Sequence, residues 1–356
     1  MKIAFLLDFH WGIKNDARHF LDYQEKFLSQ LFFPELKKRG ITQAIQFGDV
    51  MDRRKYTNHE TLYRAKRVMF DPFRDNGIAL DIIPGNHDTA LKSTNRINAL
   101  DLFLREYKNV NQIHEPTHIT YGGVKFLFVP WINAENYAST MEFIKNSDAQ
   151  IVIGHFEFSG FPVGGGMIHE HGMDANIFSK FEHVYTGHFH IKSTKGNVKY
   201  LGTPIETSWA DYGDDKGFYV FDTDTKTLEF VPNPDKLHEK IFYDDTNPEF
   251  LVYEKGLDFS IFNGKNVKLF VQKKSNKDMF EKFVEKMYKM DLVEFQIIED
   301  ISGFHELSVE VSIDATTSTG TLIDSYIDNV ETEMDKPRIK SMMQKLYIEA
   351  LMENKE

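Results

Sequence analysis

Apolar runs alternate with amphipathic stretches along the first quarter of the chain. Three runs are apolar over several consecutive positions, as in strands covered on both faces: residues 2–9, residues 43–47 and the run that ends at Pro84. Two stretches between them carry apolar side chains at helical spacing and stop at a glycine: residues 18–39, before Gly40, and residues 59–76, before Gly77. This order of strands and helices predicts an α/β fold built on a parallel sheet with right-handed crossovers.

A second sheet is predicted further along the chain. Apolar and polar residues alternate around Gly122 and Gly123, which predicts a hairpin. Residues 156–175 are rich in glycine and are predicted to form a mobile surface loop near the site. The other predicted elements are helices at 97–107 and 138–146 and strands at 150–153, 183–186, 198–201, 217–221 and 228–231.

A domain boundary is predicted at Pro232-Asn233-Pro234. The three predicted parts of the chain are residues 1–234, residues 235–318 and residues 319–356. The second part is a small α+β domain, whose predicted elements are strands at 267–271 and 307–311 and a helix at 277–287. The third part is a tail of two amphipathic helical segments separated by Pro337.

The composition indicates a globular protein. The chain of 356 residues is 41% hydrophobic and 27% charged, and no apolar run is long enough to span a membrane. No signal peptide is recognised, and the absence of cysteine fits a reducing cytoplasm and leaves no thiolate as nucleophile or metal ligand. The formal net charge of −12 argues against a uniformly basic surface that coats nucleic acid, although bound divalent cations can reverse the field at one acidic cleft.

Metal-competent side chains follow five of the predicted strands. In chain order these are Asp8 with His10, Asp49, Asn86 with His87, His155, and His188 with His190. Each set after the first is preceded by a glycine, which lets the backbone turn sharply out of its strand. The carboxyl ends of strands in an α/β sheet border the crevice where ligands bind. A single histidine on a strand is more often packed or solvated than a ligand, but five such sets in order favour a metal centre.

The donor set indicates what kind of metal centre this is. Three oxygen donors and four imidazoles are too many for one tetrahedral zinc ion, but they suit two ions that share a bridging carboxylate. Two such ions lower the pKa of a shared water and hold both the attacking and the leaving oxygen of a phosphoryl group. The sequence therefore predicts phosphoester hydrolysis.

The series DxH, GD, GNHD, GH and GHxH resembles the calcineurin-like metallophosphoesterases over about residues 1–233. The resemblance implies a core of two sheets flanked by helices, with a small α+β capping domain and a C-terminal helical tail beside it. The final motif, the Gly202-Thr203-Pro204 that follows it and the added domain and tail are most similar to SbcD-type double-strand-break repair nucleases, in their phage recombination branch. A phage-encoded chain would work in the host cytoplasm.

The resemblance also implies roles for individual residues. One ion would be held by Asp8, His10, Asp49 and His190, and the other by Asp49, Asn86, His155 and His188. Manganese is the expected metal at both sites, with magnesium as a substitute. His87 would stabilise the phosphorane or protonate the leaving 3′ oxygen. Asp88 is a further candidate of the catalytic centre, which either supports the turn and orients His87 or serves as a ligand.

One position departs from the family pattern. Many members have a second histidine three residues after the bridging aspartate, and this chain has Asp52 there. Arg53, Arg54 and Lys55 are candidates for the contact with DNA phosphate instead, and a solvated helix entry is the alternative for all three.

The sequence as a whole predicts a metal-dependent DNA nuclease that acts in recombination and double-strand-break repair. By resemblance it is a 3′-to-5′ exonuclease on duplex ends and a single-strand endonuclease, which works as a homodimer with an SbcC-type coiled-coil ATPase docked on the tail. The chain has no G-x-x-x-x-G-K-[ST] motif, so ATP would be hydrolysed by another polypeptide. Two alternatives are a stand-alone phosphodiesterase or phosphatase for small nucleotides and a non-catalytic scaffold subunit.

Overall fold

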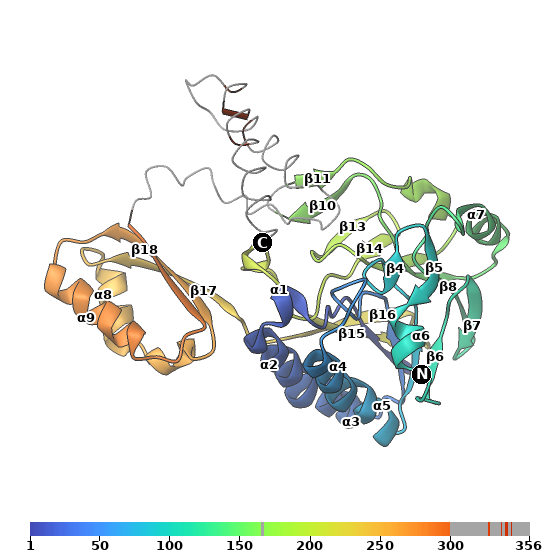
Figure 1. Cartoon of the computed structure of the whole chain (residues 1–356), viewed down its shortest axis with the longest axis horizontal. Coiled ribbons are helices and arrows are strands. Elements are labelled where there is room, and N and C mark those ends of the chain that lie inside the picture. The colour runs from blue at the N-terminus through green and yellow to red at the C-terminus, as the bar shows by residue number, and fades with distance from the viewer. Residues whose placement is uncertain (165–166, 300–326, 328–335, 337–338, 341–342, 344–356) are drawn as a thin grey trace, which may run out of the picture. The chain divides into compact units, whose positions relative to one another are not determined.

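The computed structural model describes residues 1–164, 167–299, 327, 336, 339–340 and 343 (Figure 1). Two compact units can be distinguished, Met1–Glu310 and Val311–Glu356. The predicted strand at 307–311 and, apart from the isolated positions above, the predicted tail lie outside the described residues. None of the described helices is both long and apolar enough to cross a membrane.

The first sheet has six strands in the order β16-β15-β1-β2-β3-β6. Their bounds are β16 (Thr227–Pro232), β15 (Gly217–Asp222), β1 (Lys2–Leu6), β2 (Gln43–Gln46), β3 (Ala79–Ile82) and β6 (Val110–Gln112). Strands β1, β2 and β3 are parallel, as predicted, and β6, which was not predicted, pairs parallel with β3. Strand β15 pairs antiparallel with β1 and makes the sheet mixed. Because β1, β2 and β3 are parallel, their carboxyl ends lie at a common edge of the sheet.

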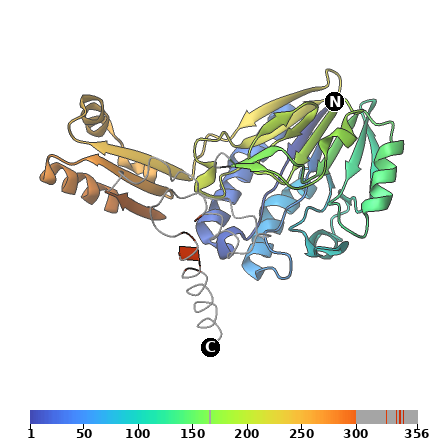
Figure 2. The same ribbon diagram turned by 90° about the horizontal axis from the view of Figure 1, so that it is seen from above.

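Two predicted helices are each interrupted by a π-helical turn. The first consists of α2 (Arg18–Phe27), the turn Leu28–Phe32 and α3 (Phe33–Arg39), and the second of α4 (His59–Ala65), the turn Lys66–Phe70 and α5 (Asp71–Asp75). Pro34 and Pro72 stand just after these turns, and neither has an N–H for the preceding turn, which explains why the α-helical ladder breaks there. The helices pack on one face of the first sheet, where they are drawn in blue (Figures 1 and 2).

The second sheet also has six strands, in the order β13-β14-β12-β9-β8-β7. Their bounds are β13 (Ser193–Lys195), β14 (Val198–Tyr200), β12 (His183–Gly187), β9 (Ile151–His155), β8 (Val124–Val129) and β7 (Thr117–Tyr121). The predicted hairpin is confirmed as the antiparallel pair β7 and β8. Aromatic rings join the two sheets: Phe5 of β1 meets Tyr185 of β12 edge-on at 5.8 Å, and Phe221 of β15 meets Phe126 of β8 edge-on at 5.5 Å.

Strands β10 (Phe161–Gly164) and β11 (Met167–His169) lie where a surface loop is predicted. The two strands pair antiparallel, so the prediction of a loop is wrong for these residues. The reason is the aromatic content of the segment, because Phe156, Phe158 and Phe161 are fully buried in a core beneath the second sheet. The glycine content of the segment, taken alone, favoured a surface loop.

Smaller elements complete the main part of the chain. They are α1 (Ile13–Asp16), β4 (Thr89–Leu91), β5 (Thr94–Asn98), α6 (Ala99–Phe103) and α7 (Tyr137–Asn146). The helix predicted at 97–107 is thus shorter in the structure, because its first residues belong to the β4–β5 hairpin.

The small α+β region is a three-stranded parallel sheet with two longer helices. Its elements are β17 (His238–Asp244), α8 (Pro248–Gly256), β18 (Asn266–Lys273), α9 (Lys277–Tyr288) and β19 (Glu294–Ile298). The predictions of β18 and α9 are confirmed, whereas β17, α8 and β19 were not predicted. Tyr243, Phe250 and Phe283 form the centre of its own core.

Candidate metal centre

All seven predicted ligands meet at the strand ends of the two sheets. Asp8 and His10 follow β1, Asp49 follows β2 and Asn86 follows β3 of the first sheet, while His155 ends β9 and His188 and His190 follow β12 of the second. The first five are fully buried and the two last are half-buried. Seven polar side chains in one largely water-free place require partners for their charges and lone pairs.

Asp49 lies at the middle of the cluster. Its Oδ2 is 3.2 Å from Nε2 of His155 and 3.7 Å from Nε2 of His10, and its Oδ1 accepts a hydrogen bond of 2.7 Å from the amide of His87. Within the described residues, two groups of potential ligands share this carboxylate, His10-Asp49-His87 and Asp49-His155-His188, and in each group the ligand atoms lie within 4.8 Å of one another. Asp49 is therefore placed to bridge two ions.

The side chains on the His10 side of Asp49, which include Asp8 and His190, fit a cation because their lone pairs face one another. Nε2 of His10 is 3.0 Å from Nε2 of His190. Asp8 is fully buried, and its Oδ2 accepts the amide of His188 at 2.6 Å, while its Oδ1 has no hydrogen-bond partner among the described residues. A buried acceptor without a donor is rare in proteins, and a bound cation would satisfy it.

The second group shows the same convergence of acceptors. Nδ1 of His155 lies 2.8 Å from the carbonyl of Phe47, a contact that assigns the proton to Nδ1 in the neutral ring and leaves the Nε2 lone pair facing the cluster. That Nε2 is 2.9 Å from Oδ1 of Asn86, and the same oxygen is 2.9 Å from Nδ1 of His188. Acceptors approach this closely only with a proton or a cation between them, so the residues fit a metal ion.

The pKa values express the competition between burial and charge. Burial raises the pKa of Asp8 to about 6, whereas the surrounding imidazoles, led by His155, outweigh burial and hold the pKa of Asp49 well below its usual range. Burial also acts to lower the pKa of His10 and His155, but the neighbouring carboxylates overcome it and raise both to about 9. In the metal-free protein these two imidazoles are therefore protonated at neutral pH, and their positive charge takes the place of a bound cation.

Two glycines allow the loops after β2 and β3 to touch. Gly48 has a φ of +95°, and a Cβ there would lie 2.6 Å from the amide nitrogen of Gly85. A Cβ on Gly85 would lie 2.4 Å from the amide nitrogen of Asp49. Gln46 fixes the turn, since its Oε1 accepts from Gly48 N at 2.7 Å and its Nε2 donates to Gly48 O at 2.8 Å. The position of the Asp49 carboxylate thus depends on glycine at both 48 and 85.

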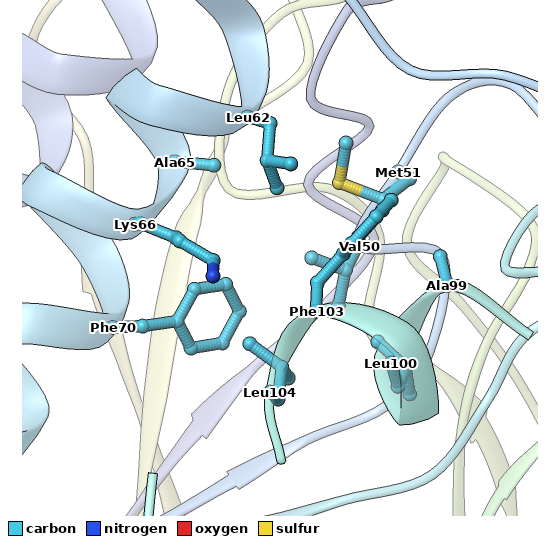
Figure 3. A pocket seen from close by; sticks show the side chains of 10 residues that line it. All are labelled: Val50, Met51, Leu62, Ala65, Lys66, Phe70, Ala99, Leu100, Phe103 and Leu104. Atoms are coloured by element: carbon cyan, nitrogen blue, oxygen red, sulfur yellow. The ribbon is translucent and has the colours of Figure 1, made fainter. Parts of the chain in front are cut away.

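The loop that carries Asp49 is anchored on its far side by apolar packing. Val50 and Met51 face Leu62, Phe70 and other apolar side chains of the helices, as Figure 3 shows. The free space between these side chains is about 10 Å³, at the lower limit for a single water molecule. The packing holds the loop from behind while its polar side faces the cluster.

Asp88 binds backbone groups of both loops. Its Oδ1 accepts the amides of Val50 at 3.0 Å and Met51 at 3.1 Å, and its Oδ2 accepts the amide of Gly85 at 2.9 Å. Burial and the nearby Asp49 raise its pKa to about 7. In this structure the side chain ties the turn together.

His87 lies at the edge of the first group. Its Nδ1 is 2.5 Å from the carbonyl oxygen of Asp52, and its ring meets that of His10 edge-on at 4.8 Å. The resemblance leaves His87 without metal, whereas its ligand atom lies within 4.8 Å of those of His10 and Asp49. It is half-buried, unlike its fully buried neighbours.

The residues after the bridging carboxylate are engaged in different ways. Oδ1 of Asp52, at the position of the family's second histidine, is 3.5 Å from Nδ1 of His10. Arg53 pairs with Asp16 at 2.7 Å and lies over the ring of Tyr56 at 5.0 Å. Arg54 is half-buried and Lys55 is exposed. Arg53 therefore connects two loops, and Lys55 is the exposed one of these three predicted phosphate contacts.

Sequence reasoning missed Trp131 beside the cluster. Its ring centroid lies 5.4 Å from that of His188 and 5.9 Å from that of His155. The position of Trp131 after β8 could have pointed to it, because the predicted ligands follow their strands in the same way. An indole does not bind metal, so a search for metal ligands passes over it.

A buried charge network beneath His190 was also missed. Nζ of Lys216 donates to the carbonyl of His190 at 2.8 Å and pairs with Asp211 at 2.7 Å and Asp214 at 3.0 Å. Asp211 in turn accepts from the hydroxyl of Thr207, which lies 3.4 Å from Nδ1 of His190. In the sequence Lys216 follows Asp214 and Asp215 in a polar segment, so nothing in its local sequence indicates that it is buried.

Two sheets whose strand ends surround a carboxylate-centred donor cluster define a metallophosphoesterase. Known proteins are similar to the chain: it is 33% identical to "Exonuclease subunit 1" of Enterobacteria phage T4 over 353 residues, 98% of this chain and 99% of that protein. It is 23% identical to a subunit of the SbcCD nuclease in Staphylococcus epidermidis and in Staphylococcus saprophyticus, over 65% of this chain and 69% of each relative.

No family model matches the chain. A solved structure of an archaeal phosphodiesterase overlays with a TM-score of 0.32 and 12% identity, and the match covers 65% of this chain and 100% of that one. The near full-length likeness to the phage protein is decisive: the chain belongs to the SbcD-type nucleases of the calcineurin-like metallophosphoesterases. It is a phosphodiester-hydrolysing enzyme that depends on divalent metal, and its predicted fold class and family are confirmed.

Proposed function

We propose that the chain is a manganese-dependent DNA nuclease subunit, which degrades duplex ends from 3′ to 5′, cuts single strands endonucleolytically and serves recombination and double-strand-break repair. The observation that carries the proposal is the position of Asp49, shared by two groups of ligand atoms at the meeting edge of two sheets. The printed names of the relatives, an exonuclease subunit and a nuclease subunit, support DNA as the substrate.

We assign the ligands in two sets around the shared carboxylate. Asp8, His10, Asp49 and His190 would hold one ion, supported by the 3.0 Å approach of the two imidazoles and the unpartnered oxygen of Asp8. Asp49, Asn86, His155 and His188 would hold the other, supported by the contacts of Asn86 to both imidazoles. Mixed oxygen and nitrogen donors suit manganese, and magnesium is the expected substitute.

The protein's own groups would then divide the work of hydrolysis. Bound divalent ions supply positive charge to the phosphoryl oxygens and make water more acidic. In its doubly protonated form His87 donates Nδ1–H to the Asp52 carbonyl, and its Nε2–H can then be given to the leaving 3′ oxygen or donated to a phosphoryl oxygen. Asp88 acts as a positioning residue, since it holds the amides of both loops and touches no reacting atom in this scheme.

Lys55 is the best candidate for a contact with the DNA backbone among the three basic residues, because it is exposed. Arg53 would contribute by fixing the loop through Asp16. Substituting Lys55 by alanine should weaken binding of every DNA sequence alike and reduce the salt dependence of binding, because phosphate contacts carry no sequence information.

The substrate can be tested with a linear duplex labelled at either the 3′ or the 5′ end. Purified protein with Mn²⁺ should release 3′-terminal nucleotides first and should lose its activity in EDTA. An Asp49→Asn variant should be inactive even with Mn²⁺. A small chromogenic phosphodiester serves as the second substrate. Rapid turnover of that diester with intact DNA would replace the proposal by the small-nucleotide phosphodiesterase, and inactivity on both would favour the scaffold subunit.

We further propose that the chain forms a homodimer and binds an SbcC-type coiled-coil ATPase through residues 319–356. The printed names of the relatives describe subunits, which supports assembly with a partner. Light scattering of the full chain, alone and with the ATPase, beside a chain that ends at residue 318, gives the test. A truncated chain that still binds the ATPase would exclude the tail as the docking segment.

A further inference from the structure

A cavity of about 310 Å³ opens directly beside the second ligand group. His155, one of the proposed ligands, forms part of its wall. The segment after β8 and the start of α7 contribute Trp131 and Tyr137 to the wall, and the remainder includes Glu157 and Met173. The volume is at the lower end of the range for small-ligand pockets, about 300 to 1,000 Å³.

The cavity has an aromatic wall on a rigid support. Both backbone groups of Trp131 are hydrogen-bonded: its amide donates to the carbonyl of Pro84 at 3.0 Å, and its carbonyl accepts from Asn95 at 2.7 Å and Asn136 at 3.0 Å. Pro84 belongs to the segment that carries Asn86, so the indole and the ligand group share one scaffold. Tyr137 is 52% exposed, which leaves a second ring free to contact a ligand.

The charge of the cavity selects the part of a nucleotide that it can hold. Glu157 is the only acidic or basic side chain besides His155 among the described residues that line it, and a carboxylate repels phosphate. Oε1 of Glu157 lies 2.9 Å from Nε2 of His169, so one of its two oxygens already faces another side chain. A flat uncharged group that stacks on an indole satisfies these conditions, and its phosphate would lie on the side of the metal ligands.

We propose that this cavity binds the nucleobase of the nucleotide whose phosphate is cleaved, by stacking on Trp131. The inference rests on the proposed nuclease function and adds a substrate-positioning site to it. Because stacking uses the π-face that every base has, the site tolerates all sequences, as digestion of DNA from any end requires. Holding the base fixes the adjoining phosphate over the ligand cluster, since His155 borders both.

The test pairs a variant with a substrate that lacks the base. Two oligonucleotides are compared, identical except for an abasic residue at the 3′ end, with wild type, Trp131→Ala, Trp131→Phe and Tyr63→Ala. Wild type should lose roughly 5- to 150-fold in kcat/KM on the abasic substrate, the range of one base–aromatic stack. Trp131→Ala should lose a similar factor on the normal substrate and nothing further on the abasic one.

The control variants separate stacking from other effects of the substitution. Trp131→Phe retains an aromatic face and should recover most of the rate, and Tyr63→Ala removes a ring that is 65% exposed on α4 and should match wild type. If the effects of Trp131→Ala and of the abasic residue multiply, the base does not stack on Trp131 and the proposal is overturned.

A second readout distinguishes stacking from support of the metal ligands. Mn²⁺ affinity, measured by electron paramagnetic resonance, should be the same in Trp131→Ala and wild type. A large drop would make Trp131 a positioning residue for His188 and would overturn the proposal.

A third measurement separates this proposal from the proposed function. Calorimetric titration of the protein in EDTA with thymidine 5′-monophosphate and with 2-deoxyribose 5-phosphate needs no catalysis. Preference for the nucleotide that is lost in Trp131→Ala supports the cavity even if wild type cuts no DNA, whereas equal binding of both ligands contradicts it.

Discussion

The backbone carbonyl of Asp52 lies 2.5 Å from Nδ1 of His87, so the loop that carries the bridging carboxylate also orients this imidazole. A carbonyl oxygen can only accept, and the contact therefore assigns a proton to Nδ1. The ring's Nε2 remains free to face the first ligand group, where it lies edge-on to His10. One loop thus positions both Asp49, the proposed bridging ligand, and the candidate proton donor.

Substituting His87 by alanine should reduce kcat on DNA by about 10²- to 10⁴-fold, the usual contribution of a positioned acid. Mn²⁺ affinity should remain within about threefold of wild type, because His87 is not among the proposed ligands of either ion. Rates come from single-turnover digestion and affinities from isothermal titration. His114→Ala, an exposed histidine outside the cluster, is the control. A more than tenfold loss of manganese affinity would instead identify His87 as a ligand.

The strand-end pattern predicted the cluster well, because parallel strands deliver their carboxyl ends to one edge whatever the details of packing. Asp8 and His10 come together for a different reason from the one that the sequence suggested. The strand was predicted to reach residue 9, with both side chains on one face, but β1 ends at Leu6 and His10 has a φ of 51°. A left-handed turn, rather than strand alternation, brings the two together.

Features that depend on tertiary packing could not be predicted from local sequence. The π-helical turns continue the apolar spacing of the helices around them, so periodicity does not reveal them. Lys216 is 1% exposed only because two aspartates and the carbonyl of His190 surround it in three dimensions. Trp131 gains its significance from its place beside His155 and His188, which come from two other strands.

The metal-free protein should lose stability as the pH rises from about 6.5 to 9. The folded protein raises the pKa of His10 and His155 from 6.5 to about 9, so their protons stabilise it fully below pH 6.5 and this contribution disappears as each ring deprotonates. His188 and His190, whose pKa values burial lowers, are neutral in the folded protein but partly protonated in the unfolded chain near pH 6.5, so they offset part of the decline up to about pH 7.5 and contribute nothing above it.

Thermal denaturation in EDTA across this pH range measures the effect. The melting temperature should fall with pH in EDTA, and the rise produced by Mn²⁺ should grow with pH because metal binding requires deprotonated imidazoles. A His10→Asn variant should show a shallower decline in EDTA than wild type. A metal-free melting temperature that is constant or rising would contradict the assigned protonation of the two rings.

Replacing Lys216 by methionine should destabilise the protein by about 3 to 5 kcal/mol, the cost of leaving a buried charge without its partner. Asp211 would be the stranded charge, since it is 2% exposed and pairs with Lys216 at 2.7 Å. The first metal site should weaken too, because Lys216 holds the carbonyl of His190. Urea denaturation and manganese titration give the two readouts.

Lys236→Met is the matched control for Lys216→Met. Its side chain is 30% exposed, lies 3.9 Å from Asp215 and donates to the carbonyl of Asp214 at 3.0 Å, so the loss should stay below about 1.5 kcal/mol. Equal effects of the two substitutions would mean that burial of Lys216 has no energetic consequence and would refute its role beneath His190.

Gly48→Ala should abolish manganese binding, whereas Gly40→Ala should leave it unchanged. Both glycines have positive φ values, +95° and +64°, so each substitution has a backbone cost of about 1 kcal/mol. Only at Gly48 does the new methyl group collide, 2.6 Å from the amide nitrogen of Gly85 and 2.8 Å from Nδ1 of His155, while nothing lies within 4 Å of it at Gly40. The collision would separate the loops that hold Asp49 and Asn86. Calorimetric titration with Mn²⁺, beside urea denaturation, measures both effects, and a Gly48→Ala protein that binds manganese normally would show that the loops can move apart without loss of the site.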